Sequence, residues 1–203
     1  MHKKILIIIL TLTVIAVTAV FMLVAKYVFY NDYIKRQNTT IKFKNFINLF
    51  DEVLSHYNPN EDEYEDESEF ITKYIKPYAK NSQIILTNNE SGENITSLKF
   101  SDGAELYIKR DMCYLIYFDL NGEEKPNVEG SDKFRFILCL YPNACKIPVN
   151  KITAFDCTSR KNYDRNKLYG LCKYYGTHCS QLIEYDNWEI KYDYPMNLSL
   201  IHI

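Results

Sequence analysis

Residues 5–25 constrain the fold of this chain more than any other segment, because they contain no charged residue, no proline and no glycine. At about 1.5 Å per residue, a helix of about 21 residues spans about 30 Å, the thickness of the hydrocarbon layer of a bilayer. A cleaved secretory signal would have a shorter apolar core and a small-residue cleavage site, and Leu23-Val24-Ala25 is a poor one. The segment therefore predicts a retained transmembrane helix.

The flanking charges and the cysteines predict the orientation of this helix. Lys3 and Lys4 favour a cytoplasmic N-terminus, although Lys26, Lys35 and Arg36 follow the helix on its other side. The six cysteines contain no CxxC pair and match no familiar zinc module, so disulfide bonds are preferred over zinc ligands or inert thiols. We therefore expect an extracytoplasmic C-terminal domain. The cysteines are Cys113, Cys139, Cys145, Cys157, Cys172 and Cys179, and the sequence leaves their pairing open.

A helical pattern continues beyond the membrane segment. Apolar residues recur at helical spacing from position 43 to position 57, with polar residues between them. Asn58-Pro59 follows and is a natural stop. One helix of about 55 residues, roughly 80 Å long, is the simplest prediction, and two helices broken near residues 38–40 are the alternative. The apolar positions are Phe43, Phe46, Ile47, Phe50, Val53, Leu54 and Tyr57.

Beyond this helix the apolar pattern changes. Residues 60–69 form an acidic run that is expected to be a solvated loop, and a short amphipathic helix follows around Phe70 and Tyr74. Residues 96–141 then alternate in polarity or form short apolar runs, which predicts a meander of about four antiparallel strands. Residues 142–203 have no obvious periodicity and are expected to be loop-like, with cross-links providing order.

The predicted fold class is α+β: a long N-terminal transmembrane helix packed on an antiparallel β-sheet, with a cysteine-rich C-terminal region. The 203 residues suffice for one domain and an anchor. The expected parts are a cytoplasmic leader with the transmembrane helix (1–30), an extracytoplasmic continuation of the helix (31–58), an acidic loop and short helix (59–95), the meander (96–141) and the cysteine-rich region (142–203).

The composition and motifs argue against several classes of function. The 24 basic residues are balanced by 26 acidic ones, so a basic surface for nucleic acid is not expected. The chain has no Walker, Rossmann, GxSxG or HExxH motif, and its four histidines are scattered. His178 and Cys179 are adjacent, but adjacent side chains rarely face each other, so a nucleophile pair is not expected. No catalytic residue is assigned, and the chain is not expected to be an enzyme.

A polar loop at residues 119–134 connects the two most apolar predicted strands, and its Asn-Gly and Pro-Asn steps favour tight turns. Its oxygen-bearing side chains are candidate ligands of calcium, the one cofactor considered. The loop is not an EF-hand, because its twelfth position is Gly130 instead of glutamate. The alternative is that the same side chains cap backbone amides of the turns. The candidate ligands are Asp119, Asn121, Asn127 and Asp132.

Three segments together resemble bacterial type IV pilin-like proteins and type II secretion pseudopilins. They are the pattern DxNGxxxPNxxGxDxF at residues 119–134, the preceding LKFSDGAELYI at residues 98–108, and an ending that contains Cys179, Asn187-Trp188 and the run Asp193-Tyr194-Pro195. The resemblance implies a long helix packed on an antiparallel sheet, and subunits that form a filament through helix–helix contacts. It also implies other pilin-like subunits and inner-membrane assembly proteins as partners, and calcium binding in some secretion pseudopilins.

The N-terminus departs from the pattern of this family. Its members have a glycine at the leader cleavage point and a glutamate at the fifth mature position, whereas Lys3-Lys4 here runs directly into the apolar segment. Leader cleavage and N-terminal methylation are therefore not expected. A permanently anchored relative, a minor subunit and a scaffold that does not polymerise remain as alternatives. The face expected to drive assembly contains Ile5, Ile9, Leu12, Ala16, Ala19 and Leu23.

The expected function is structural: a minor pilin-like subunit of a type II secretion or type IV pilus system, forming homo- or hetero-oligomers through its N-terminal helix. The expected location is the cell membrane, with one span and a cytoplasmic N-terminus, or a pilus or pseudopilus. The alternative is a membrane-anchored extracytoplasmic binding domain that does not polymerise.

Overall fold

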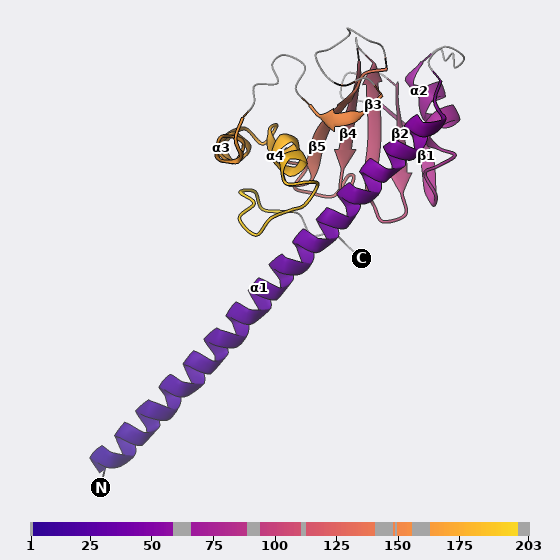
Figure 1. Cartoon of the computed structure of the whole chain (residues 1–203). Coiled ribbons are helices and arrows are strands. Elements are labelled where there is room, and N and C mark those ends of the chain that lie inside the picture. The colour runs from indigo at the N-terminus through magenta and orange to yellow at the C-terminus, as the bar shows by residue number, and fades with distance from the viewer. Residues whose placement is uncertain are drawn as a thin grey trace.

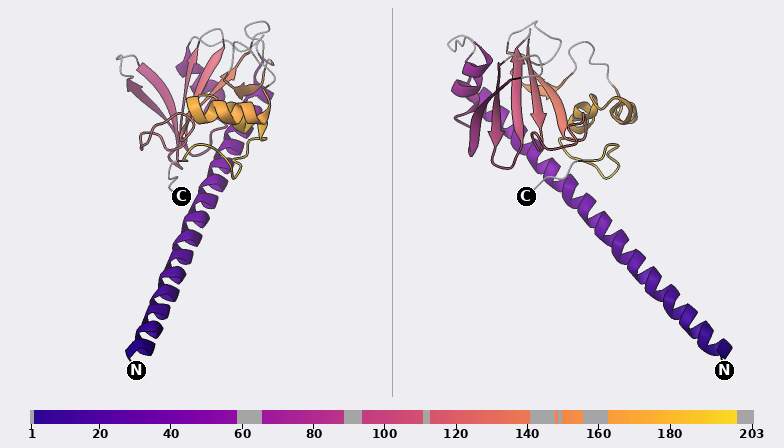
Figure 2. Two further views of the ribbon diagram at one scale, coloured as in Figure 1. Left: turned by 90° about the vertical axis from the view of Figure 1, so that its left-hand side faces the viewer. Right: turned by 180° about the vertical axis from the view of Figure 1, so that it is seen from behind.

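The molecule consists of a globular head on one end of a long projecting helix (Figure 1). The chain starts at the far end of this helix, and the described C-terminal segment lies at the end of the head from which the helix emerges (Figures 1 and 2). The computed structural model describes residues 2–58, 66–88, 94–110, 113–140, 148, 150–155 and 163–198.

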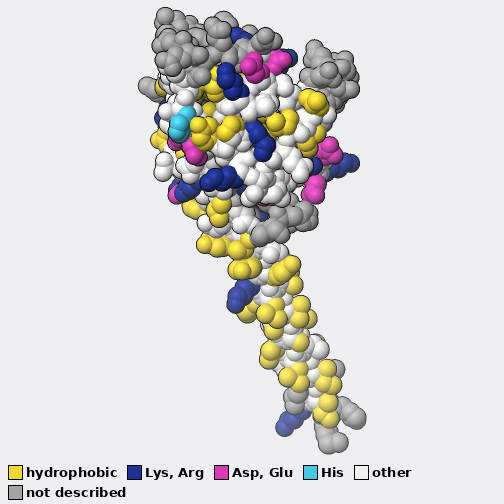
Figure 3. All heavy atoms as spheres, turned by 90° about the vertical axis from the view of Figure 1, so that its right-hand side faces the viewer, with side chains coloured by type: hydrophobic (Ala, Val, Ile, Leu, Met, Phe, Trp, Pro, Cys, Tyr) yellow, Lys and Arg dark blue, Asp and Glu magenta, His cyan; other side chains and the backbone are white. Residues whose placement is uncertain are grey.

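The long helix, α1, spans His2–His56 without a break. It contains neither proline nor glycine, so every residue keeps its helical hydrogen bond and no kink is favoured. This confirms the prediction of a single helix, and the alternative break near residues 38–40 is absent. The N-terminal part of α1 is exposed and apolar, and the helix is long and apolar enough to cross a membrane. Figure 3 shows this apolar surface continuing from the tip of the helix to the base of the head.

A short helical segment follows and covers the C-terminal end of α1. It consists of α2 (Glu67–Phe70) and one π-helical turn, η1 (Ile71–Ile75). The Asp66 side chain caps α2 by accepting a hydrogen bond from the backbone N–H of Glu69, at 2.9 Å. The buried rings of Phe70 and Tyr74 pack against Tyr57. The predicted amphipathic helix is therefore present, and residues 59–65 of the expected acidic loop lie outside the described residues.

The sheet is a six-stranded antiparallel meander in the order β1-β2-β3-β4-β5-β6. It begins and ends outside the expected range 96–141. The first strand lacks alternation because three apolar residues are consecutive in SQIILTN, and the last has only three residues. The strands are β1 (Ser82–Asn88), β2 (Asn94–Phe100), β3 (Glu105–Arg110), β4 (Tyr114–Asp119), β5 (Lys133–Leu138) and β6 (Ile152–Ala154).

The core lies between the C-terminal half of α1 and one face of this sheet, as Figure 2 shows from two sides. Phe43 is fully buried, and its ring meets the ring of Phe134 edge-on at a centroid distance of 4.7 Å. One turn further along α1, Phe46 stacks on Phe118 at 4.5 Å. Since Phe118 and Phe134 are cross-strand partners, the aromatic residues of α1 meet those of β4 and β5 in one cluster.

The C-terminal region differs from the loop-like prediction, because it contains two helices, α3 (Arg165–Tyr175) and α4 (Cys179–Tyr185). The side chain of Asp164 caps α3 at its start, and Gly176, with φ of 61°, ends it. Only Leu168 and Cys172 of α3 are buried. Two buried positions give too short a stripe for a periodicity to be recognised, which explains why the sequence pattern did not indicate this helix.

Two disulfide bonds confirm the prediction for four of the six cysteines. Cys113 and Cys139, at adjoining ends of β4 and β5, form one bond with a Cα–Cα distance of 4.6 Å. Cys172 of α3 and Cys179 of α4 form the other and close the turn between these helices. The candidates Cys145 and Cys157 lie outside the described residues.

Candidate functional site

The projecting part of α1 carries the six residues expected to drive assembly. All six are exposed, and their spacing of three and four residues places them along one face of the helix. An apolar surface of this length is stable only in lipid or against other helices. The six residues are Ile5, Ile9, Leu12, Ala16, Ala19 and Leu23.

A buried lysine joins α1 to two turns of the sheet. The Lys42 ammonium donates to the backbone carbonyl of Asp102 at 2.9 Å and to that of Leu120 at 2.7 Å, and it pairs with the Asp102 carboxylate at 3.3 Å. Burial lowers the pKa of Lys42, and the nearby Asp102 charge partly opposes this effect. Because Asp102 lies in the β2–β3 turn and Leu120 follows β4, these contacts fix the helix relative to the sheet.

We expect the Lys42→Met variant to lose about 2 kcal/mol of unfolding free energy, because one buried and one partly buried carbonyl group lose their donor. The measurement is urea unfolding of the detergent-solubilised chain, followed by circular dichroism. Lys44→Met is the control, since Lys44 is exposed and its ion pair among the described residues is with Glu189, at 3.3 Å. Its expected change is below about 0.5 kcal/mol. Equal changes in the two variants would contradict the structural role assigned to Lys42.

The polar loop between β4 and β5 holds its acidic side chains against its own backbone. The Asp119 carboxylate accepts hydrogen bonds from the N–H groups of Asn121 and Gly122, at 3.1 and 2.9 Å. The Asp132 carboxylate accepts from Asn127 and Val128, at 2.8 and 2.6 Å. The carboxylates therefore cap turn amides, as the alternative interpretation of this loop expects.

The four candidate calcium ligands share this loop, and the two asparagines among them use their amide nitrogen atoms to bind the loop's own backbone. The side-chain amides of Asn121 and Asn127 point nitrogen atoms at the carbonyls of Lys125 and Glu123, at 3.4 and 3.3 Å. Among the described residues, no group of three or more His, Cys, Asp or Glu side chains is arranged to hold a metal ion. Calcium binding by Asp119, Asn121, Asn127 and Asp132 stays a prediction.

Asp119 gives this loop a pH dependence. Burial raises the pKa of its carboxyl from 3.8 to about 6, although the hydrogen bond from the Asn121 backbone N–H lowers the pKa and partly opposes this effect. The folded state therefore binds a proton more readily than the unfolded chain, so this group makes the fold less stable as pH rises from about 4 to about 6. We expect Asp119→Asn to flatten the dependence of the urea midpoint on pH in that window. An unchanged slope in the variant would contradict this assignment.

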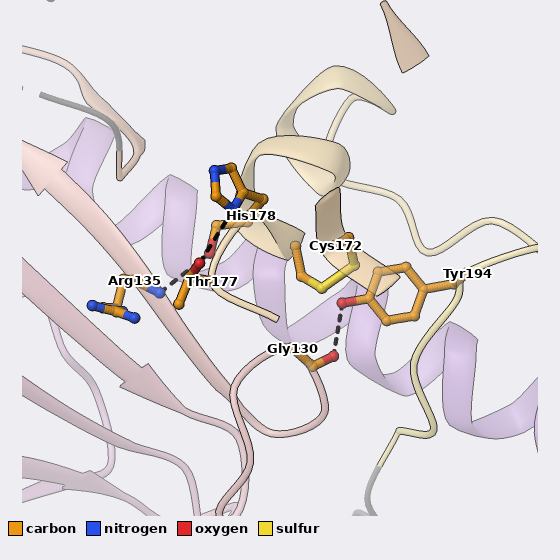
Figure 4. The surroundings of a disulfide bond; sticks show 8 residues. Gly130, Arg135, Cys172, Thr177, His178 and Tyr194 are labelled. Carbon is orange, nitrogen blue, oxygen red and sulfur yellow. Dashed lines mark hydrogen bonds between the residues drawn. A yellow bond between two sulfur atoms is a disulfide. The ribbon is translucent and has the colours of Figure 1, made fainter. Parts of the chain in front are cut away.

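The same loop contacts the second disulfide through Gly130 (Figure 4). The Tyr194 hydroxyl donates to the carbonyl oxygen of Gly130 at 2.8 Å, and burial raises the pKa of Tyr194. A Cβ atom on Gly130 would lie 2.5 Å from the sulfur of Cys179 and 3.1 Å from the carbonyl oxygen of Gly176. The loop, the disulfide and the C-terminal segment therefore meet with no space for a side chain at Gly130.

An arginine ties the C-terminal segment to α3. Arg165 makes two hydrogen bonds to Asp186, at 2.7 and 2.8 Å, and two to Asp193, both at 2.8 Å. These partners raise the pKa of Arg165 and lower that of Asp193. Paired guanidinium–carboxylate contacts of this kind fix orientation as well as distance.

In a comparison with known protein families, residues 27–198 match a family model described as a family of unknown function (DUF6613). The chain belongs to this family. The part it shares with DUF6613 starts just after the apolar segment and includes the C-terminal half of α1, the sheet and the C-terminal helices. No curated protein and no solved structure matches the chain. In shape, this DUF6613 member is pilin-like, with a long N-terminal apolar helix packed on an antiparallel sheet.

The structure brings together residues of the two motifs noted in the DUF6613 chain. Gly130 of the polar loop meets Cys179 and Tyr194 of the C-terminal run, and Asp193 binds Arg165. Cys179 is in a disulfide, so it does not form a nucleophile pair with His178. Lys42 and Arg165 were not indicated by the sequence, because a lysine between apolar helix positions and an arginine at the start of a helix are common on solvated surfaces.

Proposed function

We propose that the chain is a structural, non-enzymatic pilin-like subunit, which assembles in the membrane through the projecting part of α1. The supporting observation is the division of one unbroken helix into an exposed apolar half and a half buried under the sheet. The expected system is a type II secretion or type IV pilus machine, in which this chain is a minor subunit. Its partners would be other pilin-like subunits and inner-membrane assembly proteins.

The helix suits this role because it connects the assembly surface rigidly to the head. Ala16 and Ala19 are small, which allows the backbones of neighbouring helices to approach closely in lipid. The buried half is fixed by aromatic packing and by Lys42, so a movement of the membrane half is transmitted to the head. A flexible link at residues 38–40 would have removed this coupling.

Photo-crosslinking in membranes tests the proposal. A benzophenone amino acid is placed at Leu12, on the expected assembly face, or at Leu10, which is as exposed as Leu12 but lies about 200° around the helix. Adducts of two or more chains, or of this chain with another pilin-like subunit, are expected from position 12 and much more weakly from position 10. Absence of adducts at both positions, or equal adducts from both, would contradict assembly through this face.

The alternative is a membrane-tethered binding domain that does not polymerise. It is favoured by the start of the family match at residue 27, since the shared part then excludes all six residues of the expected assembly face. The lack of a glutamate in residues 5–25 points the same way. A chain that yields only monomers in the crosslinking experiment, with Met1 retained in mass spectra of the membrane-extracted protein, would support this alternative.

A further inference from the structure

A group of exposed aromatic residues follows the apolar segment of α1. Tyr27, Phe29, Tyr30 and Tyr33 are each between 52% and 74% exposed. They span about 9 Å along the helix, close to the thickness of one headgroup layer, which is about 5–8 Å. Tyrosine suits this layer because its ring is apolar and its hydroxyl reaches water. We call these four residues the aromatic collar.

The tyrosines of the collar point away from the head. At about 100° per residue, Tyr27, Tyr30 and Tyr33 lie on the side of the helix opposite Phe43 and Phe46, which pack on the sheet. The three tyrosines therefore cover the side of the helix away from the head, whereas Phe29 lies about 20° around the helix from Arg36, on the side of the head. For the head to contact the membrane, an exposed aromatic side chain of the head itself must lie on the side of the helix from which the head projects.

Tyr192 supplies such a group. It lies in the segment after α4, at the end of the head from which α1 projects (yellow in Figures 1 and 2), and it is 85% exposed. Its carbonyl oxygen accepts a hydrogen bond from the Arg36 guanidinium at 3.3 Å. Arg36 is about 4.5 Å along the helix from Tyr33 and about 9 Å from Tyr30, so Tyr192 lies next to the upper end of the collar, and a tilt of α1 toward the head brings it closer to the headgroup layer.

The charges at this level fit a lipid surface. Lys26, Lys35 and Arg36 are opposed by one acidic residue, Asp32, so the segment has a net charge of +2. Basic residues next to a membrane span are attracted to anionic lipid headgroups. This attraction also explains why Lys26, Lys35 and Arg36 follow the span on the extracytoplasmic side, where the positive-inside rule does not favour basic residues.

We propose that the head rests on the bilayer that α1 crosses, with the three tyrosines of the aromatic collar on one side of the helix and Tyr192 on the other, all in the headgroup layer. This inference depends on the membrane anchor of the proposed function but not on assembly. The contact fixes the depth and tilt of the helix before any partner binds.

Fluorescence quenching by spin-labelled lipids tests this contact. The full chain is reconstituted in vesicles of phosphatidylcholine and phosphatidylglycerol that carry a nitroxide on the headgroup or deep in the acyl chain. Tryptophan reporters are introduced one at a time as Tyr192→Trp, Tyr174→Trp and Val14→Trp, with the native Trp188 as a constant background. Tyr174 is the matched control, because it is a highly exposed tyrosine on α3, farther from the projecting helix.

Headgroup nitroxide is expected to quench Tyr192→Trp at least about twofold more than Tyr174→Trp, and deep nitroxide is expected to quench Val14→Trp. Equal quenching at positions 192 and 174, with Val14→Trp quenched, would overturn the contact and leave the anchor intact. No quenching of Val14→Trp by the deep label would overturn the anchor, and with it this inference.

Discussion

Alanine at Gly130 is expected to cost at least about 3 kcal/mol of unfolding free energy, because its methyl group would occupy the space of the Cys179 sulfur. Gly130 has φ of +82°, and the added Cβ atom would lie 2.5 Å from a disulfide sulfur that is buried and has no freedom to move aside. The carbonyl of Gly130 also accepts a hydrogen bond from the Tyr194 hydroxyl, so displacement of the loop would break this partly buried hydrogen bond as well.

Gly103 is the matched control for this variant. It has the same φ of +82°, but a Cβ atom there meets nothing within 4 Å. Gly103→Ala therefore reports the backbone strain alone, about 1–2 kcal/mol. The two variants are compared by urea unfolding of the full chain in detergent, and by the rate of proteolysis after α4. A difference below about 1 kcal/mol would show that the contact between the loop and the disulfide contributes little.

Phe43→Ala is expected to destabilise the head by about 3–5 kcal/mol. The Phe43 ring is fully buried and lies within 4.7–6.2 Å of the rings of Phe118, Phe134 and Phe136. Its removal leaves a cavity between α1 and the sheet that the rigid aromatic neighbours cannot fill. Because the same helix carries the exposed apolar segment, loss of this contact should also free the head to change its orientation relative to that segment.

Phe29→Ala provides the control on the same helix. Phe29 is 74% exposed and lies outside the head, so its removal should change the unfolding free energy of the head by less than about 0.5 kcal/mol. Both variants are measured by thermal or urea unfolding in the same detergent. If Phe43→Ala were as stable as Phe29→Ala, the C-terminal half of α1 would not be part of the core of the head.

The turns of the polar loop could be predicted from the sequence, but the role of its carboxylates could not. Its Asn-Gly and Pro-Asn steps correctly indicated tight turns, and its position between two apolar strands indicated a connection within the sheet. From the sequence alone, Asp119 and Asp132 could be either metal ligands or caps of turn amides. The capping contacts could be recognised only once the backbone of the loop was in place, because they depend on which N–H groups face each carboxylate.

In the C-terminal region, the secondary structure itself could not be predicted from the sequence pattern. Its helix α3 has 11 residues and buries two of them, and α4 has only 7 residues, so neither shows a periodic pattern long enough to be recognised. Their stability comes from the Cys172–Cys179 bond and from Arg165, which binds Asp186 and Asp193. Such contacts cannot be predicted from local sequence patterns, because nothing in the sequence near one residue indicates which distant residue it will bind.

The long helix, the change from helical to alternating pattern and the preference for an oxidising compartment all follow from the order and number of residues in the chain. These properties depend on local patterns and counts: hydropathy over 21 positions, the absence of proline and glycine, and the number of cysteines. Three other features follow from packing alone: the pairing of the cysteines, the attachment of two sheet turns by Lys42, and the position of Gly130 between a disulfide and Tyr194. The Lys42–Leu120 and Tyr194–Gly130 contacts join residues 78 and 64 positions apart, and only the packed head brings them together.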